Sequence, residues 1–250
     1  MAPKPEQPDA EANAAAEHAA LLDSRYGELS PIEVIERSVE RYFAGKIAAV
    51  SSFGADSAVL LHMIATVDRS IPVIFLDTGK HFGETLDYRN ALVTDLGLTD
   101  IRVVVPDEAA LERDDPAGDL HARDTDACCA VRKVEPMARG IEPFGAWFTG
   151  RKRFQAKTRT ALPVFEPVGI RIRINPLAHW GTLELADYMR EHRLRENPLV
   201  AYGYLSIGCF PCTQPVRPGE DARSGRWAGQ TKTECGIHLP GLGGTSAAAR

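Results

Sequence analysis

Apolar and polar positions alternate with two different periods through the middle of the chain. Short apolar runs, typical of buried strands, are separated by longer stretches with a helical period, such as the one that places Tyr88, Leu92 and Leu96 on one face. The predicted strands are 47–50, 73–76, 101–105, 147–150 and 170–174, and the predicted helices are 56–67, the stretch around 88–96, and 182–192.

This order of strands and helices predicts an α/β fold, with a parallel twisted sheet and helices on both faces. In the last strand Arg171 and Arg173 alternate with isoleucines, which predicts one solvent-exposed face. Residues 1–20 contain no continuous apolar stretch, so we expect a flexible N-terminal tail there. The expected organisation is therefore a tail at 1–20, an α/β domain at 21–214 and a mobile C-terminal segment at 215–250.

Composition and charge exclude some classes of function. The 250 residues include 29 Lys and Arg against 34 Asp and Glu, a net charge of −5, whereas binding to a phosphate backbone needs an excess of cations. No apolar run is long enough to span a membrane, and the first twenty residues do not resemble a secretory signal. We therefore expect a cytoplasmic protein with no nucleic-acid and no membrane partner, and a homo-oligomer stays open.

Two loops follow predicted strands at the sheet edge where α/β proteins bind ligands. Residues 51–57 (SSFGADS) open a helix, so backbone N–H groups around Ser51, Ser52 and Gly54 can face an anion. Asp77 and Gly79 follow the next strand, where a carboxylate can accept a hydrogen bond from a ribose or an adenine. Each loop alone is also typical of an ordinary turn. Together, after successive strands, they favour a nucleotide site.

Four of the five cysteines form a pattern typical of metal binding. Cys128 and Cys129 are adjacent, and Cys209 and Cys212 form a CxxC pair. Four such thiolates can ligate zinc or an iron–sulfur cluster, and adjacent cysteines suit the larger cluster better than a single zinc ion. The alternative is two buried cysteines and a redox-active CxxC pair. We favour the metal site.

The fifth cysteine, Cys235, lies in a polar, Gly-rich stretch near the chain end and by itself is typical of an exposed cysteine. Cations cluster in the loops before it. A basic stretch that includes Arg159 follows Gly150 at the end of the fourth predicted strand, and Arg223 and Arg226 lie shortly before Cys235. In an acidic protein, clustered cations after strand ends predict a small polyanionic ligand.

Together, these motifs resemble the assimilatory adenylyl-sulfate reductases, relatives of the phosphoadenylyl-sulfate reductases. The resemblance runs from about residue 50 to residue 239 and rests on SSFGADS, LDTGKHF, CCAVRKVEP, TGRKRFQ, CFPC, PGEDARSGRW and ECGIHL. It implies the adenine-nucleotide α-hydrolase-like, or PP-loop, fold. It also implies reduction of adenosine 5′-phosphosulfate to sulfite and AMP in sulfate assimilation, with thioredoxin or a glutaredoxin-like dithiol protein as partner.

The resemblance implies a role for each motif residue. Cys235 would attack the sulfur and carry an S-sulfonate, and Lys133 would lie between the cluster and the sulfate. The ligands of a 4Fe-4S cluster would be Cys128, Cys129, Cys209 and Cys212. The substrate-binding residues would be Ser51, Ser52, Gly54, Asp77, Gly79, Gly150, Arg159, Arg223 and Arg226.

Three other functions stay open at this point. Phosphoadenylyl-sulfate reductases perform the same chemistry on a nucleotide with an extra 3′-phosphate, but members with that preference commonly lack the four cluster cysteines. PP-loop enzymes that thiolate tRNA usually have an SGGxDS loop, which this chain lacks, and its negative charge suits tRNA poorly. A metal-binding regulator that senses redox state would not need Cys235.

Overall fold

A single mixed sheet forms the centre of the computed structural model, which describes residues 7–230, 232 and 234–238. The strands follow the order β3-β2-β1-β4-β6-β5, and neighbours are parallel except for β5 and β6, which are antiparallel. Their bounds are β1 (Ile47–Val50), β2 (Val73–Leu76), β3 (Ile101–Val104), β4 (Ala146–Thr149), β5 (Phe165–Val168) and β6 (Arg171–Ile174). Of the expected mobile C-terminal segment at 215–250, residues 231, 233 and 239–250 lie outside the described residues.

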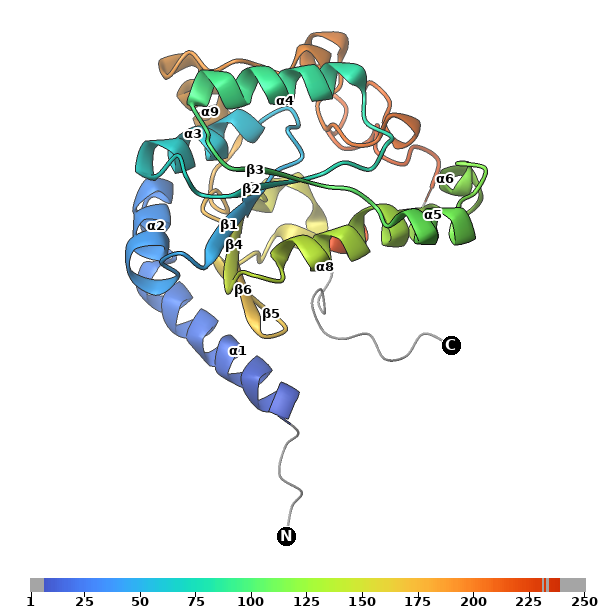
Figure 1. Cartoon of the computed structure of the whole chain (residues 1–250). Helices are drawn as coiled ribbons and strands as arrows, with labels where there is room; N and C mark the ends of the chain where they lie inside the picture. Colours follow the sequence, from blue (N-terminus) through green and yellow to red (C-terminus); the bar gives the residue numbers. More distant parts are fainter. Residues whose placement is uncertain (1–6, 231, 233, 239–250) are drawn as a thin grey trace.

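Helices cover both faces of the sheet, as the sequence predicts: α3, α4 and α9 lie on one face and α8 on the other (Figure 1). The helix bounds are α1 (Gln7–Tyr26), α2 (Pro31–Arg37), α3 (Ser57–Val67), α4 (Gly83–Leu96), α5 (Glu108–Asp114), α6 (Leu120–Arg123), α7 (Thr125–Cys129), α8 (Glu135–Ile141) and α9 (Thr182–Glu191). Two single turns matter for the site: η2 (Ala130–Val134), which continues α7, and η7 (Gly236–His238). In the described part of the chain, no helix is long and apolar enough to cross a membrane.

The continuous apolar strands are explained by two cores, one on each face of the sheet. Successive residues of a strand point to opposite faces, so Ala49 and Phe148 pack in the core beneath α3, while Ala48 and Trp147 pack in the core beneath α8. Strands buried on both faces lack the polar alternation of a half-exposed strand.

The expected tail at 1–20 is wrong for residues 7–20, because Gln7–Tyr26 form α1. Ala19, Leu22 and Tyr26 of this helix are buried in the main core. Their spacing of three and four residues forms a narrow apolar stripe on one side of an Ala-rich helix. The overall composition of residues 1–20 did not indicate this helix, because only the residues of the stripe need to be apolar.

The expected solvent-exposed face of the strand near 170–174 is also wrong, because Arg173 is only 1% exposed. The antiparallel strand β5 places Glu166 directly opposite Arg173, and the guanidinium donates to both carboxylate oxygens, at 2.7 and 2.9 Å. A cross-strand ion pair of this kind allows a charged residue to occupy a buried position. The partner strand was not predicted, so the pair could not be foreseen.

Docking of α1 can be tested by shortening one buried side chain. Leu22→Ala removes buried methyl groups from the core, so we expect it to lower the free energy of unfolding by about 2–5 kcal/mol. Leu21→Ala, at the adjacent 60% exposed position, should lower it by about 0.5 kcal/mol or less. Urea denaturation followed by circular dichroism measures both. Equal small losses would contradict the docking of α1.

Candidate active site at the carboxyl edge of the sheet

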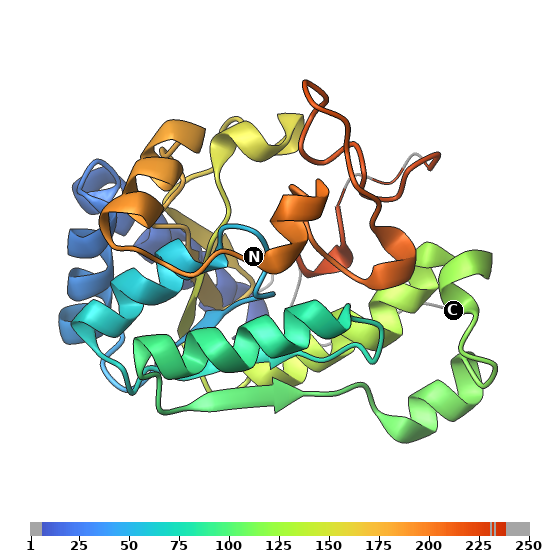
Figure 2. The same ribbon diagram turned by 90° about the horizontal axis from the view of Figure 1, so that it is seen from above.

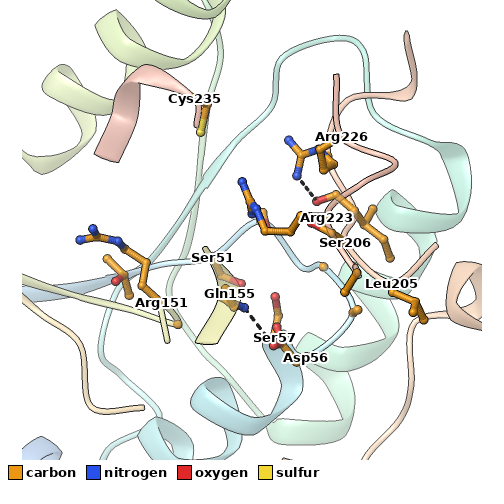
Figure 3. Close-up of a pocket in the computed structure, with 18 of the residues that line it drawn as sticks. Ser51, Asp56, Ser57, Arg151, Gln155, Leu205, Ser206, Arg223, Arg226 and Cys235 are labelled. Atoms are coloured by element: carbon orange, nitrogen blue, oxygen red, sulfur yellow. Dashed lines mark hydrogen bonds between the residues drawn. The ribbon is translucent and has the colours of Figure 1, made fainter. Parts of the chain in front are cut away.

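A cavity of about 690 Å³ lies at the carboxyl edge of the sheet. Loops after β1, β2 and β4 line it together with residues from the last quarter of the chain, which Figure 2 shows gathered at this side of the fold. Nine residues singled out from the sequence line it: Ser51, Ser52, Gly54, Lys133, Gly150, Arg159, Arg223, Arg226 and Cys235. Figure 3 shows Cys235 at the opposite end of the cavity from Asp56 and Ser57.

Two of the predicted substrate-binding residues, Asp77 and Gly79, are not among the residues that line this cavity. The Asp77 carboxylate instead accepts a hydrogen bond from the Gly79 amide at 3.0 Å, which closes a tight turn. Thr78 and His81 from the same loop line the cavity in their place. The loop therefore reaches the cavity through different side chains from those that the sequence indicated.

The loop between β1 and α3 adopts a strained backbone conformation. Phe53 has φ +49°, an uncommon value for a residue other than glycine, and its side chain is fully buried. The Ser51 hydroxyl accepts from the Phe53 amide at 3.1 Å, and Asn197 donates to the Phe53 carbonyl at 3.0 Å. Strain of this kind persists where surrounding contacts hold it, commonly at functional sites. Here it places the loop and the positive end of α3 at the cavity.

A buried lysine of the basic stretch after β4 supports the same loop, a structural role that the sequence did not indicate. The ammonium of Lys152 forms an ion pair with Asp56 at the start of α3, and its side chain is only 1% exposed. Gln155 also donates to Asp56, at 3.5 Å. These contacts connect the loop after β4 to the loop after β1, so two walls of the cavity hold each other in place.

The four cysteines expected to bind a metal come from two distant parts of the chain. All five cysteines are free thiols, and Cys128, Cys129 and Cys209 are buried. Burial and the neighbouring Cys129 raise the pKa of the Cys128 thiol to about 11. Within the described residues, the geometry shows no group of three or more His, Cys, Asp or Glu side chains that could hold a metal ion.

Lys133 connects this cysteine group to the cavity. Burial acts to lower the pKa of Lys133, but the charges of Cys209, Cys235 and Cys129 outweigh it and raise that pKa. Burial likewise acts to raise the pKa of the Cys209 thiol, but Lys133 and a hydrogen bond with Thr78, at 3.3 Å, lower it. A cation therefore stands beside both the cysteine group and Cys235.

The adjacent Arg132 is structural. Its guanidinium donates to Asp115 at 2.6 and 3.1 Å and to the Thr78 carbonyl at 2.8 Å, and it is buried. These bonds fix η2 against the loop after β2. Lys133, the next residue, is thereby held at the cavity wall.

Close packing holds Cys235 at the other end of the cavity. Cys235 is buried and packs against Trp227 and Cys129. Gly236 approaches η2 so closely that a Cβ atom there would lie 2.7 Å from a Val134 methyl carbon. The glycine after the cysteine therefore lets η7 rest directly on the turn that carries Lys133.

The predicted cations line the same cavity as Cys235, and two of them share a carboxylate partner that the sequence did not indicate. Arg159 donates to both oxygens of Glu234 at 2.7 Å, and Arg223 lies 3.4 Å from the same carboxylate. Burial lowers the pKa of Arg223, and Glu234 opposes that shift. Burial, with Arg159 next in strength, holds the pKa of His238 well below its usual range. Glu234 and His238 flank Cys235 in the ECGIHL motif, which was the available signal for them.

The sheet, with its cavity at the carboxyl edge, defines an adenine-nucleotide α-hydrolase-like protein. A solved FMN adenylyltransferase from Candida glabrata shares this fold, with TM-score 0.55 and 15% identity over 82% of this chain and 74% of that one. The solved phosphoadenylyl-sulfate reductase from Candida auris, in a phosphate complex, is more similar, with TM-score 0.67 and 29% identity over 86% of this chain and 100% of that one.

Sequence comparison places the chain in a particular family. The family model of the phosphoadenosine phosphosulfate reductase domain matches residues 46–215, and the chain belongs to this family. An adenosine 5′-phosphosulfate reductase from Mesorhizobium japonicum is 76% identical over 90% of this chain and 88% of that protein. One from Chelativorans sp. is 64% identical over 97% of both.

The structural role of Arg132 can be tested through its partner. Asp115→Ala leaves a buried guanidinium without its counter-charge, because the two side chains are 0% and 10% exposed, so we expect a loss of about 3–5 kcal/mol in the free energy of unfolding. Asp119→Ala breaks a pair with Arg123 that is more than half exposed and should cost less than about 1 kcal/mol. Chemical denaturation compares them, and similar losses in both variants would refute the structural role.

Proposed function

We propose that this protein is an adenosine 5′-phosphosulfate reductase that transfers the sulfonyl group to Cys235 and releases AMP. The observation that carries the proposal is the position of Cys235. Cys235 lines the cavity together with Lys133, Arg223 and Arg226, whereas the other four cysteines, all in the described part of the chain, do not. Two relatives that are 76% and 64% identical are named adenosine 5′-phosphosulfate reductases, which supports the choice of substrate.

The loop between β1 and α3 would bind the nucleotide. A cavity of about 690 Å³ is within the usual range for small-molecule sites. Ser51, Ser52 and Gly54 line it where α3 begins, and the helix start provides partial positive charge for an anion. Arg159, Arg223 and Arg226 would bind the phosphosulfate, because guanidinium groups match the geometry of phosphate and sulfate oxygens.

In the first step the Cys235 thiolate attacks the sulfonyl sulfur. A sulfur–sulfur bond forms, the bond from sulfur to the bridging phosphate oxygen breaks, and AMP leaves with the electron pair. Attack by a thiolate on an anion is opposed by charge repulsion. Lys133, Arg223 and Arg226 line the same cavity and would offset both the repulsion and the charge that develops on the leaving phosphate.

In the second step a dithiol protein such as thioredoxin, acting in the cytoplasm, releases sulfite. One of its thiolates attacks the Cys235 sulfur, the sulfur–sulfur bond to the sulfonate breaks, and sulfite leaves with the electron pair. The second thiol of the partner then resolves the mixed disulfide and frees Cys235. The partner's two thiols are oxidised to a disulfide while sulfur(VI) becomes sulfur(IV), so the electrons balance.

The four remaining cysteines would hold a 4Fe-4S cluster. Support comes from the donor set: four free thiols, buried or half-buried, whose charges act on one another. The buried indole N–H of Trp227, in contact with this group, has no hydrogen-bond partner among the described residues. When bound, the cluster would supply fixed charge beside Lys133. The chain's own residues would bind and orient the substrate, and Cys235 would accept its sulfonyl group.

A phosphoadenylyl-sulfate reductase is the second candidate, because the solved enzyme from Candida auris resembles this chain with TM-score 0.67. That enzyme is 29% identical, whereas the adenosine 5′-phosphosulfate reductases from Mesorhizobium japonicum and Chelativorans sp. are 76% and 64% identical. The higher identities favour the nucleotide without a 3′-phosphate. A larger kcat/KM for the 3′-phosphorylated nucleotide would overturn this choice.

The nucleophile can be tested by mass spectrometry. Mixing the protein with adenosine 5′-phosphosulfate in the absence of any thiol should add the mass of SO₃ to the peptide that contains Cys235, because no dithiol is present to release sulfite. Cys235→Ser should form no adduct and produce no sulfite, with turnover reduced by at least about a thousandfold, as expected when a nucleophile is removed.

Binding of AMP by the Cys235→Ser variant, measured by calorimetry, is the control for an intact cavity. An adduct on another cysteine, or sulfite production by the variant at the wild-type rate, would refute the assignment.

The cluster assignment predicts different outcomes for two cysteine-to-serine variants. Anaerobically purified wild-type protein and Cys235→Ser should each contain about four iron atoms and four sulfides per chain, and Cys209→Ser should lose most of both. Iron and sulfide analysis, with the visible absorption spectrum, measures the content. Zinc in place of iron, or equal iron loss in both variants, would contradict the assignment.

A further inference from the structure

A carboxylate of the chain itself lies at the cations that the proposed function assigns to the substrate. Both oxygens of Glu234 accept from Arg159, at 2.7 Å each, and Arg223 lies 3.4 Å from one of them. The side chains of Arg159 and Glu234 are only 5% and 13% exposed, so this is an inner contact rather than a surface ion pair. Glu234 directly precedes Cys235.

The bidentate edge of Arg159 is therefore already used. Its Nε and one Nη donate to Glu234, and the other Nη donates to the Gln155 side chain at 2.7 Å. A guanidinium presents such a paired edge to one carboxylate, phosphate or sulfate at a time. A phosphosulfate that binds Arg159 through this edge must displace Glu234.

The residues that follow Cys235 are held by contacts with which a substrate anion does not compete. Arg173 donates to the backbone carbonyls of Ile237 and His238 at 3.3 Å each, and Glu166 fixes its guanidinium from the neighbouring strand. Arg173 lies in β6 and is almost fully buried. Residues 234–238 are thus held at two points, one by exchangeable charge and one by the sheet.

We propose that Glu234 is a positioning residue that occupies the substrate's anion site when the cavity is empty. When the phosphosulfate binds, it replaces Glu234 as the anion that contacts Arg159 and Arg223. This exchange frees the Glu234 side of residues 234–238, while Arg173 retains the other side. Cys235 lies between the two anchors, so the release of Glu234 would let it move toward the sulfonyl sulfur of the bound substrate. The inference rests on the proposed function for the identity of the anion.

The exchange predicts competition between Glu234 and nucleotide anions. Glu234→Gln keeps the shape of the side chain but removes its charge, so we expect it to bind ADP about tenfold more tightly than wild type. ADP is unreactive, and its β-phosphate replaces the sulfate. Asp126→Asn is the matched control, because it breaks an ion pair with Lys232 that also ties down this part of the chain but places no anion at the arginines. Its Kd for ADP should stay within about twofold of wild type.

Isothermal titration calorimetry gives the three dissociation constants. Equal Kd values for wild type and Glu234→Gln, or weaker binding by Glu234→Gln, would overturn the inference. Equal tightening in Asp126→Asn would also overturn it, because mere loosening of the segment would then explain the gain.

Hydrogen exchange of residues 234–238 separates this inference from the proposed function. In wild type, ADP or inorganic sulfate should raise exchange at Glu234 and Cys235, and in Glu234→Gln exchange should already be high without either. If neither protein binds ADP, the proposed function fails, and inorganic sulfate still tests the exchange at the arginines. No change in wild-type exchange with sulfate at saturation, or a decrease, would overturn the inference.

Discussion

Buried positive charge is the constraint on which the rest of this structure depends. A protein with net charge −5 lines one cavity with several guanidinium groups and Lys133, and it also buries Lys152 and Arg173 away from water. An unpaired buried cation is costly, so nearby carboxylates fix them in place. Asp56 holds Lys152, Glu166 holds Arg173, and Glu234 holds Arg159. The cations are thereby oriented before any ligand arrives, and preorganised charge of this kind is what stabilises a developing anion.

The parallel sheet brings these pairs together. Loops after β1, β2 and β4 leave the same edge, so residues nearly a hundred positions apart, such as Asp56 and Lys152, meet there. The antiparallel strand β5 adds a carboxylate from the side, and Glu166 in turn orients the arginine that holds residues 237 and 238. The sheet therefore anchors both the floor of the cavity and the segment that closes one end of it.

The periodic features of the fold could be predicted from the sequence. The strands of the parallel sheet are marked by short apolar runs, and nine of the eleven residues expected to be catalytic or substrate-binding line one cavity. Helix α1 was missed because three buried side chains suffice to dock a helix that otherwise consists mainly of alanines and polar residues. Arg173 was placed on the wrong side because its burial depends on Glu166, a cross-strand partner that no local pattern indicates. Asp77 was predicted to bind the substrate but closes a turn instead, because aspartate is equally suited to both roles.

The same physical logic connects the missed residues to the mechanism. Glu166 also pairs with Arg151 at the cavity, but a substrate anion cannot displace it from Arg173, which is 1% exposed, lies within the sheet and does not line the cavity. Glu234 can be displaced, because Arg159 and Arg223 line the cavity. A permanent counter-ion maintains the structure, whereas an exchangeable one makes the position of Cys235 depend on the ligand. In the proposed reaction, this difference would release the nucleophile only when a sulfur atom is present for it to attack.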